Sequence, residues 1–201
     1  MIRTTLTRQR TFIRDAGASR SQMVDTGGGG LLPTTLLRDT REQRPWTFDG
    51  YPVETKDVTL STGDYAVPAH CRHDPDVDTY HPAFAVERKS GADFLTAITW
   101  QRERFKAELR RAGAWEQPLA VVVETSWQTL LRNRGCMASR DVHPAQVAGT
   151  VLAWSRHYNV AFYFLESRRR AERCAFLLFV KHGLVRRRDA LENDGVGHEY
   201  V

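Results

Sequence analysis

The sequence contains few cysteines and no long apolar run, and both scarcities limit what kind of protein it can be. Its three cysteines lie at positions 71, 136 and 174, an odd number without a CxxC pair. This pattern argues against a disulfide framework or a zinc ribbon and favours a reducing compartment. The longest apolar run, residues 175–180, is far shorter than the about 20 residues that cross a bilayer. We therefore expect a soluble, intracellular protein with no membrane contact.

The composition is that of an ordinary globular domain with a basic excess. Of 201 residues, 41% are hydrophobic and 26% are charged, which predicts one compact domain with short extensions. Lys and Arg number 29 against 24 acidic residues, for a net charge of +5. This excess weakly favours a polyanionic partner such as nucleic acid.

Three regions are expected along the chain. Residues 1–30 are Arg-rich and end in four glycines, which predicts a flexible basic tail that can contact phosphates. Asp15 and Asp25 within it disfavour an organellar transit peptide. Residues 31–183 form the predicted folded domain. Gly183 is expected to end the last helix, leaving residues 184–201 as a polar C-terminal tail.

Short apolar runs alternate with helical patterns from residue 31 onward, which predicts an α/β fold. Strands are expected at residues 35–38, 53–58, 64–67, 84–87, 119–123 and 160–165. The last two are apolar without alternation, so we expect central strands that helices cover on both faces. Helices are expected at residues 91–112, after a cap and proline at residues 141–144, and at residues 172–182.

Acidic and basic side chains gather at the ends of several predicted strands. Because side chains alternate along a strand, Glu87 and Lys89 face one way and Arg88 the other. If the strand of Asp64 is the hairpin neighbour, Asp64 meets Glu87 across the pair, and the two carboxylates can bind a hard divalent cation. With Lys89 beside them, the arrangement suits a metal-dependent phosphodiesterase. Taken alone, a Glu-x-Lys pair at a strand end is more often a solvated ion pair.

Three motifs in order carry a resemblance to a known family. They are LRDTRE at residues 37–42, GDY at residues 63–65 and VERKSGADF at residues 86–94. Together they resemble the nuclease domain of the XPF/Mus/Hef structure-specific endonucleases, whose pattern is GD, a spacer, ERK, three residues and D. The resemblance covers about residues 36–183. It implies a restriction-endonuclease-like core with a central mixed sheet, and cleavage of one strand of branched duplex DNA with Mg²⁺ or Mn²⁺.

The resemblance also implies roles for individual residues. Asp39, Asp64 and Glu87 would bind the metal, and Lys89 would be the catalytic lysine. Three further residues would line or brace the catalytic site: Glu42, Arg88 and Asp93. Two arginines, Arg41 and Arg104, would bind DNA. Two of these roles have a purely structural alternative, since Arg104 can be a surface residue of its helix and Asp93 can cap a helix.

The chain departs from the family pattern in two places. Glu108 stands where family members usually have Gln, which affects the expected substrate contacts rather than the metal site. Residues 68–83 resemble an insertion in the hairpin, and we expect a mobile polar loop beside the active site.

Two weaker alternatives for this insertion are open. A calcium loop would begin with Asp74, Asp76 and Asp78, but the Gly and Glu that complete such a loop are missing. A zinc site would use His70, Cys71, His73 and His81, but these residues do not have the regular spacing of zinc ligands.

The helix-hairpin-helix repeats of eukaryotic family members do not fit in residues 184–201. DNA affinity is then expected from basic helix faces, the tails or a separate DNA-binding partner. Because the family pairs through its terminal helices, the helix at residues 172–182 suggests a homodimer or a heterodimer; burial within one subunit is the alternative. The leading hypothesis is an endonuclease of DNA repair or recombination. A catalytically silent scaffold that pairs with an active nuclease, and a nuclease of the same core with another target, are the alternatives.

Overall fold

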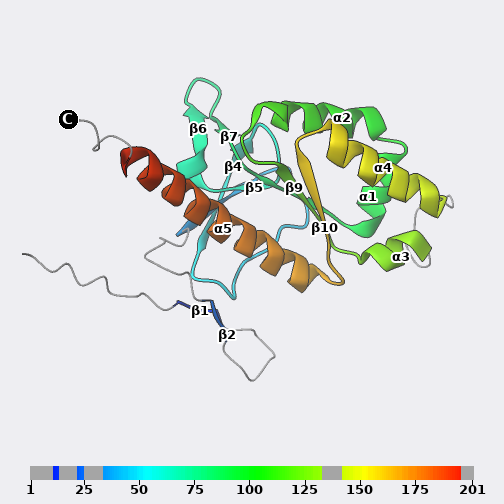
Figure 1. The fold of residues 1–201 in the computed structure, drawn as a ribbon, viewed down its shortest axis with the longest axis horizontal. Coiled ribbons are helices and arrows are strands. Elements are labelled where there is room, and N and C mark those ends of the chain that lie inside the picture. The colour runs from blue at the N-terminus through cyan, green and yellow to red at the C-terminus, as the bar shows by residue number, and fades with distance from the viewer. Residues whose placement is uncertain (1–10, 14–21, 25–33, 133–141, 196–201) are drawn as a thin grey trace, which may run out of the picture.

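The computed structural model describes residues 11–13, 22–24, 34–132 and 142–195. It shows a curled mixed sheet with helices on both faces (Figure 1). The eight strands of this sheet are β3 (Thr35–Asp39), β4 (Glu54–Leu60), β5 (Tyr65–Ala66), β6 (Cys71–Asp74), β7 (Thr79–Pro82), β8 (Val86–Lys89), β9 (Leu119–Val123) and β10 (Val160–Phe164). The α/β fold predicted from the sequence is confirmed.

The strands follow the order β10-β9-β8-β5-β3-β4-β7-β6. Strand β5 runs antiparallel to its two neighbours, β3 and β8, and β6 runs antiparallel to β7, whereas the other pairs are parallel. The short β5 therefore sits between β3 and β8, which brings the ends of three strands together. Each of the six predicted strands corresponds to an observed one, and β9 has the predicted bounds.

Strand β9 is central as predicted, and its five residues are all buried. Strand β10 is an edge strand instead, because only β9 pairs with it among the described strands. Both faces of β10 contact a hydrophobic core, which explains why the strand is apolar throughout. Phe162 and Phe164 pack against one core, and Tyr163 packs against the other. The apolar sequence therefore indicated correctly that both faces of β10 are covered. It did not show whether the strand lies inside the sheet or at its edge.

The helices divide between the two faces of the sheet. One core contains buried residues of α1 (Gly91–Ile98), α2 (Arg102–Arg111), α3 (Trp127–Arg132) and α4 (Pro144–His157), together with Leu119, Val121 and Val123. The other contains Ala120 and Val122 packed with α5 (Arg168–Gly195), the long helix that crosses the molecule in Figure 1. Alternate residues of β9 therefore link two cores, which fixes this strand firmly. No helix in the described parts of the chain has the length and hydrophobicity that a bilayer span requires.

The predicted helix over residues 91–112 is interrupted. Helix α1 ends at Ile98 and α2 begins at Arg102. In the turn between them, the Thr99 hydroxyl donates to the Leu95 carbonyl at 2.7 Å, and the Gln101 N–H donates to the Thr96 carbonyl at 3.0 Å. These local bonds compete with continuation of the helix. Helix α3 was not predicted. Pro144 is the first residue of α4 as expected, and His143 is its N-cap. Asp141, the first residue of the predicted cap, lies outside the described residues.

The predicted end of the last helix is wrong. Helix α5 continues through Gly183 to Gly195, so residues 184–195 are helical rather than a tail. Glycine inside a helix costs only about 1 kcal/mol relative to alanine, and the sequence that follows Gly183 is rich in Leu, Arg, Ala and Glu, which favour helix. In the predicted N-terminal tail, β1 (Thr11–Ile13) pairs with β2 (Gln22–Val24), and the remaining residues of that region lie outside the described ones.

The insertion at residues 68–83 is not the loop that we predicted. It forms a short 3-10 helix, η1 (Pro68–His70), and the β6–β7 hairpin, whose strand β7 pairs with β4 and extends the sheet. The outer edge of β4 offers unpaired backbone groups, and an added hairpin can use them without needing a long apolar pattern. None of the residues of this insertion lines the cavity between β3, β8, α1 and α2 that is described below.

Neither metal alternative for the insertion is supported. In the β6–β7 register, Arg72 faces His81 and His73 faces Tyr80, so His81 points to the opposite side from Cys71 and His73. Asp78 is hydrogen-bonded to His73 at 3.0 Å. Within the described part of the chain, no group of three His, Cys, Asp or Glu residues is placed to hold a metal ion.

Candidate active site

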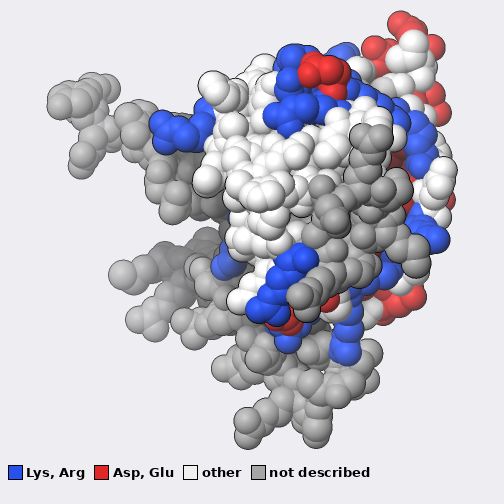
Figure 2. Space-filling view, turned by 90° about the vertical axis from the view of Figure 1, so that its right-hand side faces the viewer, with Lys and Arg blue, Asp and Glu red and all other residues white. Residues whose placement is uncertain are grey.

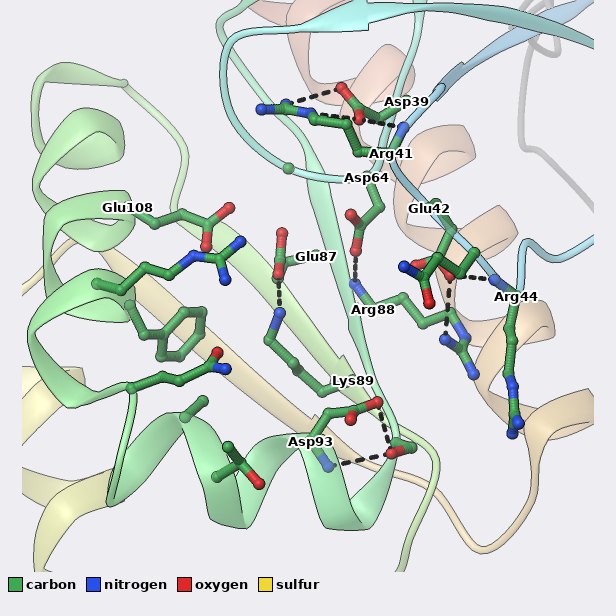
Figure 3. A pocket seen from close by; sticks show the side chains of 18 of the residues that line it. Asp39, Arg41, Glu42, Arg44, Asp64, Glu87, Arg88, Lys89, Asp93 and Glu108 are labelled. Carbon is green, nitrogen blue, oxygen red and sulfur yellow. Dashed lines mark hydrogen bonds and ion pairs between the residues drawn. The ribbon is translucent and has the colours of Figure 1, made fainter.

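The predicted site residues share one cavity. It has a volume of about 780 Å³ and lies where β3 and β8 end and β5 begins, facing α1 and α2. Figure 3 shows it from close by. All nine predicted site residues line it: Asp39, Arg41, Glu42, Asp64, Glu87, Arg88, Lys89, Asp93 and Arg104.

A glycine turn places Asp64 in this cavity. Gly63 has a φ of +80°, and a Cβ atom there would lie 2.6 Å from the Ala85 Cβ, so a side chain would be strained and would clash. The Asp64 N–H donates to the Val86 carbonyl at 2.9 Å, and Asp64 Oδ2 accepts the Arg88 N–H at 2.7 Å. The GD motif therefore fixes Asp64 against β8.

The side chains of the ERK motif alternate between the two faces of β8, as predicted. Glu87 and Lys89 face α2, where Glu87 accepts a hydrogen bond from the Lys89 ammonium and Lys89 lies 5.1 Å from the centre of the Phe105 ring. Arg88 points the other way, toward Glu42 (Figure 3). The Lys89 ammonium thus accompanies the Asp64 and Glu87 carboxylates, whereas Arg88 belongs to a separate network.

The carboxylates of Asp64 and Glu87 are near each other and poorly solvated. Burial raises the pKa of Glu87 to about 8, with Lys89 opposing the shift and Glu108 adding to it. Burial and the Glu87 charge also raise the pKa of Asp64 well above its usual range. For Lys89, burial lowers the pKa, but the Glu87 and Asp64 charges raise it by more. The one ammonium therefore does not offset the cost of burying Asp64 and Glu87 in their ionised forms.

The carboxylates of Asp64 and Glu87 fit a divalent cation. Glu87 Oε2 is buried and has no hydrogen-bond partner, and its neighbour Asp64 adds a second carboxylate. Mg²⁺ is usually held by one or two carboxylates, with waters and substrate phosphates completing the shell. An unpartnered carboxylate oxygen next to a second carboxylate can serve as a ligand for such an ion.

Asp39 is engaged differently from Asp64 and Glu87. Its carboxylate accepts two hydrogen bonds from the Arg41 guanidinium, at 2.7 and 2.9 Å, and one from the Leu60 N–H at 2.8 Å. Asp39 is buried, whereas the Arg41 side chain is 68% exposed. Binding of a metal by Asp39 stays a prediction, and it would require Arg41 to move away.

Arg88 anchors a buried ionic network that sequence reasoning missed in part. It donates to both carboxylate oxygens of Glu124, at 2.8 and 2.7 Å, and lies 3.3 Å from Glu42. Glu124 also accepts from the Trp46 indole at 2.7 Å and from Arg168 at 3.0 Å. The signal in the sequence was Glu124 directly after the apolar strand β9, but nothing local identified Arg168 at the start of α5.

The last two predicted site residues, Asp93 and Arg104, lie on helices α1 and α2. Asp93 accepts a hydrogen bond from the Ser90 hydroxyl at 2.7 Å, and its own N–H donates to that oxygen at 3.1 Å, so the pair caps α1. Asp93 lines the cavity as well, which agrees with both roles considered for it. Arg104 lies on the exposed face of α2 and also reaches the cavity.

Further basic residues border the cavity beyond those predicted. Arg44 and Arg111 line it, and Arg111 donates to the Thr62 hydroxyl at 2.9 Å. Viewed from the end that carries α3 and α4, Lys and Arg side chains gather around a largely uncharged centre, including at the level of α2 (Figure 2). Within the cavity, arginines from several elements lie beside the carboxylates, and these cations suit a polyanion.

Comparisons with known proteins found one matching family model and similar solved structures. The family model described as ERCC4 domain matches residues 38–178. Among solved structures, XPF from Aeropyrum pernix is similar with a TM-score of 0.51 and 19% identity, over 72% of this chain and 64% of that one. XPF from Aeropyrum pernix in a complex with DNA is similar with a TM-score of 0.50 and 17% identity, over 78% of this chain and 66% of that one. The search of curated proteins found no match.

Proposed function

Because the chain belongs to the ERCC4 domain family, we propose that it is a metal-dependent endonuclease that cuts DNA at branched or flap structures. Family membership confirms the resemblance read from the motifs. The observation that carries the proposal is the buried, unpartnered Glu87 Oε2 beside Asp64 and Lys89, in a cavity bordered by arginines. The setting would be an intracellular compartment where DNA is repaired or recombined.

The cavity residues suit hydrolysis of a phosphodiester. Asp64 and Glu87 would hold Mg²⁺ or Mn²⁺, which when bound supplies an activated water and polarises the phosphate. Lys89, charged and fixed by Glu87, would stabilise the negative charge that develops on the phosphate oxygens. Arg104 and Arg111 would grip the scissile or neighbouring phosphates through their guanidinium groups. Arg88 would act by holding β8 in place through Glu124.

Helix α5 supports a proposal about partners. A groove of about 720 Å³ runs beside it, lined by apolar residues such as Leu165 and Leu178 and by the cations Arg169, Arg173 and Lys181. Together with the β10 edge, it would pair with a second copy or with a related subunit. We expect sedimentation velocity at micromolar concentration to show a dimer, alone or after mixing with such a subunit; a chain that stays monomeric in both cases would contradict this pairing.

Cleavage of labelled DNA tests the nuclease proposal. Splayed-arm, 3′-flap, four-way and linear duplex DNA would be incubated with Mg²⁺ or Mn²⁺ and with wild type or Lys89→Ala. We expect nicking of branched DNA that needs metal and falls by about a hundred- to a thousandfold in the variant, because one charge-stabilising donor is lost.

Lys106→Ala is the matched control, since Lys106 is a lysine of α2 that pairs with exposed Glu103. It should cleave as wild type does. DNA binding without cleavage by the wild type, in either metal, would instead favour the scaffold alternative, in which a partner supplies the catalysis. Equal cleavage of linear and branched DNA would remove the structure preference while leaving the nuclease activity.

A further inference from the structure

We propose that Glu108 is a third acidic residue of the metal site, where it accepts hydrogen bonds from waters of the cation that Asp64 and Glu87 would hold. This inference rests on the proposed function and deepens it. The departure at Glu108 was expected to affect contacts with the substrate rather than the metal site. Its position in the cavity points instead to the cation.

The spacing of residues along α2 directs Glu108 into the cavity. Residues three or four apart share a face of a helix, and Arg104, Glu108 and Arg111 keep this spacing and all line the cavity. The adjoining residues Phe105 and Leu109 are buried in the core, which fixes the rotation of α2 against the sheet. The direction of Glu108 is therefore set by the packing of its helix.

Glu108 faces the carboxylate that lacks a complete set of partners. In Figure 3 its side chain extends from α2 toward Glu87. Burial is the main cause of the raised pKa of Glu87, and the Glu108 charge adds to it. Glu87 is 3% exposed, and its Oε2 atom is buried without a hydrogen-bond partner. A divalent cation at this oxygen would relieve the repulsion between the two carboxylates.

The protein's own cations do not supply this compensation. The Glu108 charge raises the pKa of Lys89 and of Arg41, after larger contributions from other groups, so both cations are within its electrostatic reach. Lys89 is paired with Glu87, however, and Arg41 is paired with Asp39. In the described part of the chain, neither of them forms an ion pair with Glu108.

A hydrated cation fits between these carboxylates better than a bare one. Mg²⁺ usually keeps several waters when one or two carboxylates bind it, and a metal-bound water donates hydrogen bonds to a nearby carboxylate. No three acidic residues among those that the structure describes are placed to hold an ion directly, so Glu108 would act through water. Groups that contact the direct ligands of a metal in this way contribute about 10- to 100-fold to its affinity.

Metal binding in the absence of DNA tests this inference. Titration calorimetry would measure the dissociation constant of Mn²⁺ for wild type, Glu108→Gln and the control Glu103→Gln, which alters a 74% exposed carboxylate of the same helix. We expect Glu108→Gln to weaken Mn²⁺ binding by about ten- to a hundredfold and Glu103→Gln by less than about twofold, because solvent screens an exposed charge. In EDTA, Glu108→Gln should unfold at the same temperature as wild type or higher, since it removes a charge that repels Glu87.

The other outcomes separate this inference from the nuclease proposal. Unchanged Mn²⁺ affinity in Glu108→Gln, or equal weakening in both variants, would overturn the role of Glu108 while cleavage by wild type still stands. Weaker binding in a variant that unfolds earlier in EDTA would indicate a structural role instead. Selective weakening in a protein that cleaves no DNA would support the role of Glu108 and refute the nuclease. A wild type that binds no Mn²⁺ would overturn the inference whether or not it cleaves.

Discussion

Asp64→Asn is expected to abolish DNA cleavage without weakening the fold. Glu87 is buried and Asp64 is half-buried, both carboxylates raise the pKa of the Lys89 ammonium, and the Glu87 charge disfavours ionisation of Asp64. Asparagine keeps an oxygen that can accept the Arg88 N–H, now at 2.7 Å from Asp64 Oδ2, and it removes one of the repelling charges. Loss of a metal ligand costs several kcal/mol in the transition state, which corresponds to about a thousandfold or more in rate.

Unfolding measurements separate the catalytic effect of this variant from its structural one. In EDTA, thermal and urea unfolding should show Asp64→Asn at least as stable as wild type. Mg²⁺ or Mn²⁺ should stabilise the wild type, by about 2.7 kcal/mol at a hundred times the dissociation constant, and the variant much less. Asp57→Asn, on an exposed carboxylate that pairs with Arg38, is the control and should change neither cleavage nor the metal response. A variant that cleaves normally, or that is clearly less stable in EDTA, would show that Asp64 has another role.

Replacing Arg88 with Met is expected to cause the largest loss of stability. The Arg88 side chain is 6% exposed, and it neutralises Glu124 and Glu42, which are 10% and 9% exposed. Removing one partner of a buried ionic network leaves uncompensated charges and typically costs about 3–5 kcal/mol. Arg168 and Trp46 still contact Glu124, so the loss should fall toward the lower end of that range.

Arg38→Met provides a closely matched control for Arg88→Met. Arg38 also makes two hydrogen bonds to a single carboxylate, but its partner Asp57 is 54% exposed, and exposed pairs contribute about 0–1 kcal/mol. Urea unfolding of the three proteins would give the two differences in the free energy of unfolding. Similar small differences for both variants would mean that the Arg88 network does not support the fold in the way its burial indicates.

Much of the site could be predicted from the sequence because its signals are local. Period-two alternation along β8 was enough to place Glu87 and Lys89 on one face and Arg88 on the other. The strand that carries Asp64 was expected to be the hairpin neighbour of the strand that carries Glu87, and β5 does pair with β8. Residues whose positions depend only on their own strand or turn were therefore located correctly.

Other features were decided by contacts between segments that are distant in sequence. The Leu60 N–H that binds Asp39 comes from β4, and the Glu108 carboxylate that faces Glu87 comes from α2; no local pattern reveals either approach. Arg168 reaches Glu124 across 44 residues of chain, and the β6–β7 hairpin forms because β4 offers it an edge. The sequence by itself determined which side chains share a face of a strand and which residues lie at strand ends, since these features depend on local backbone geometry. Only the tertiary structure decided which charges meet, because that depends on how separate elements pack.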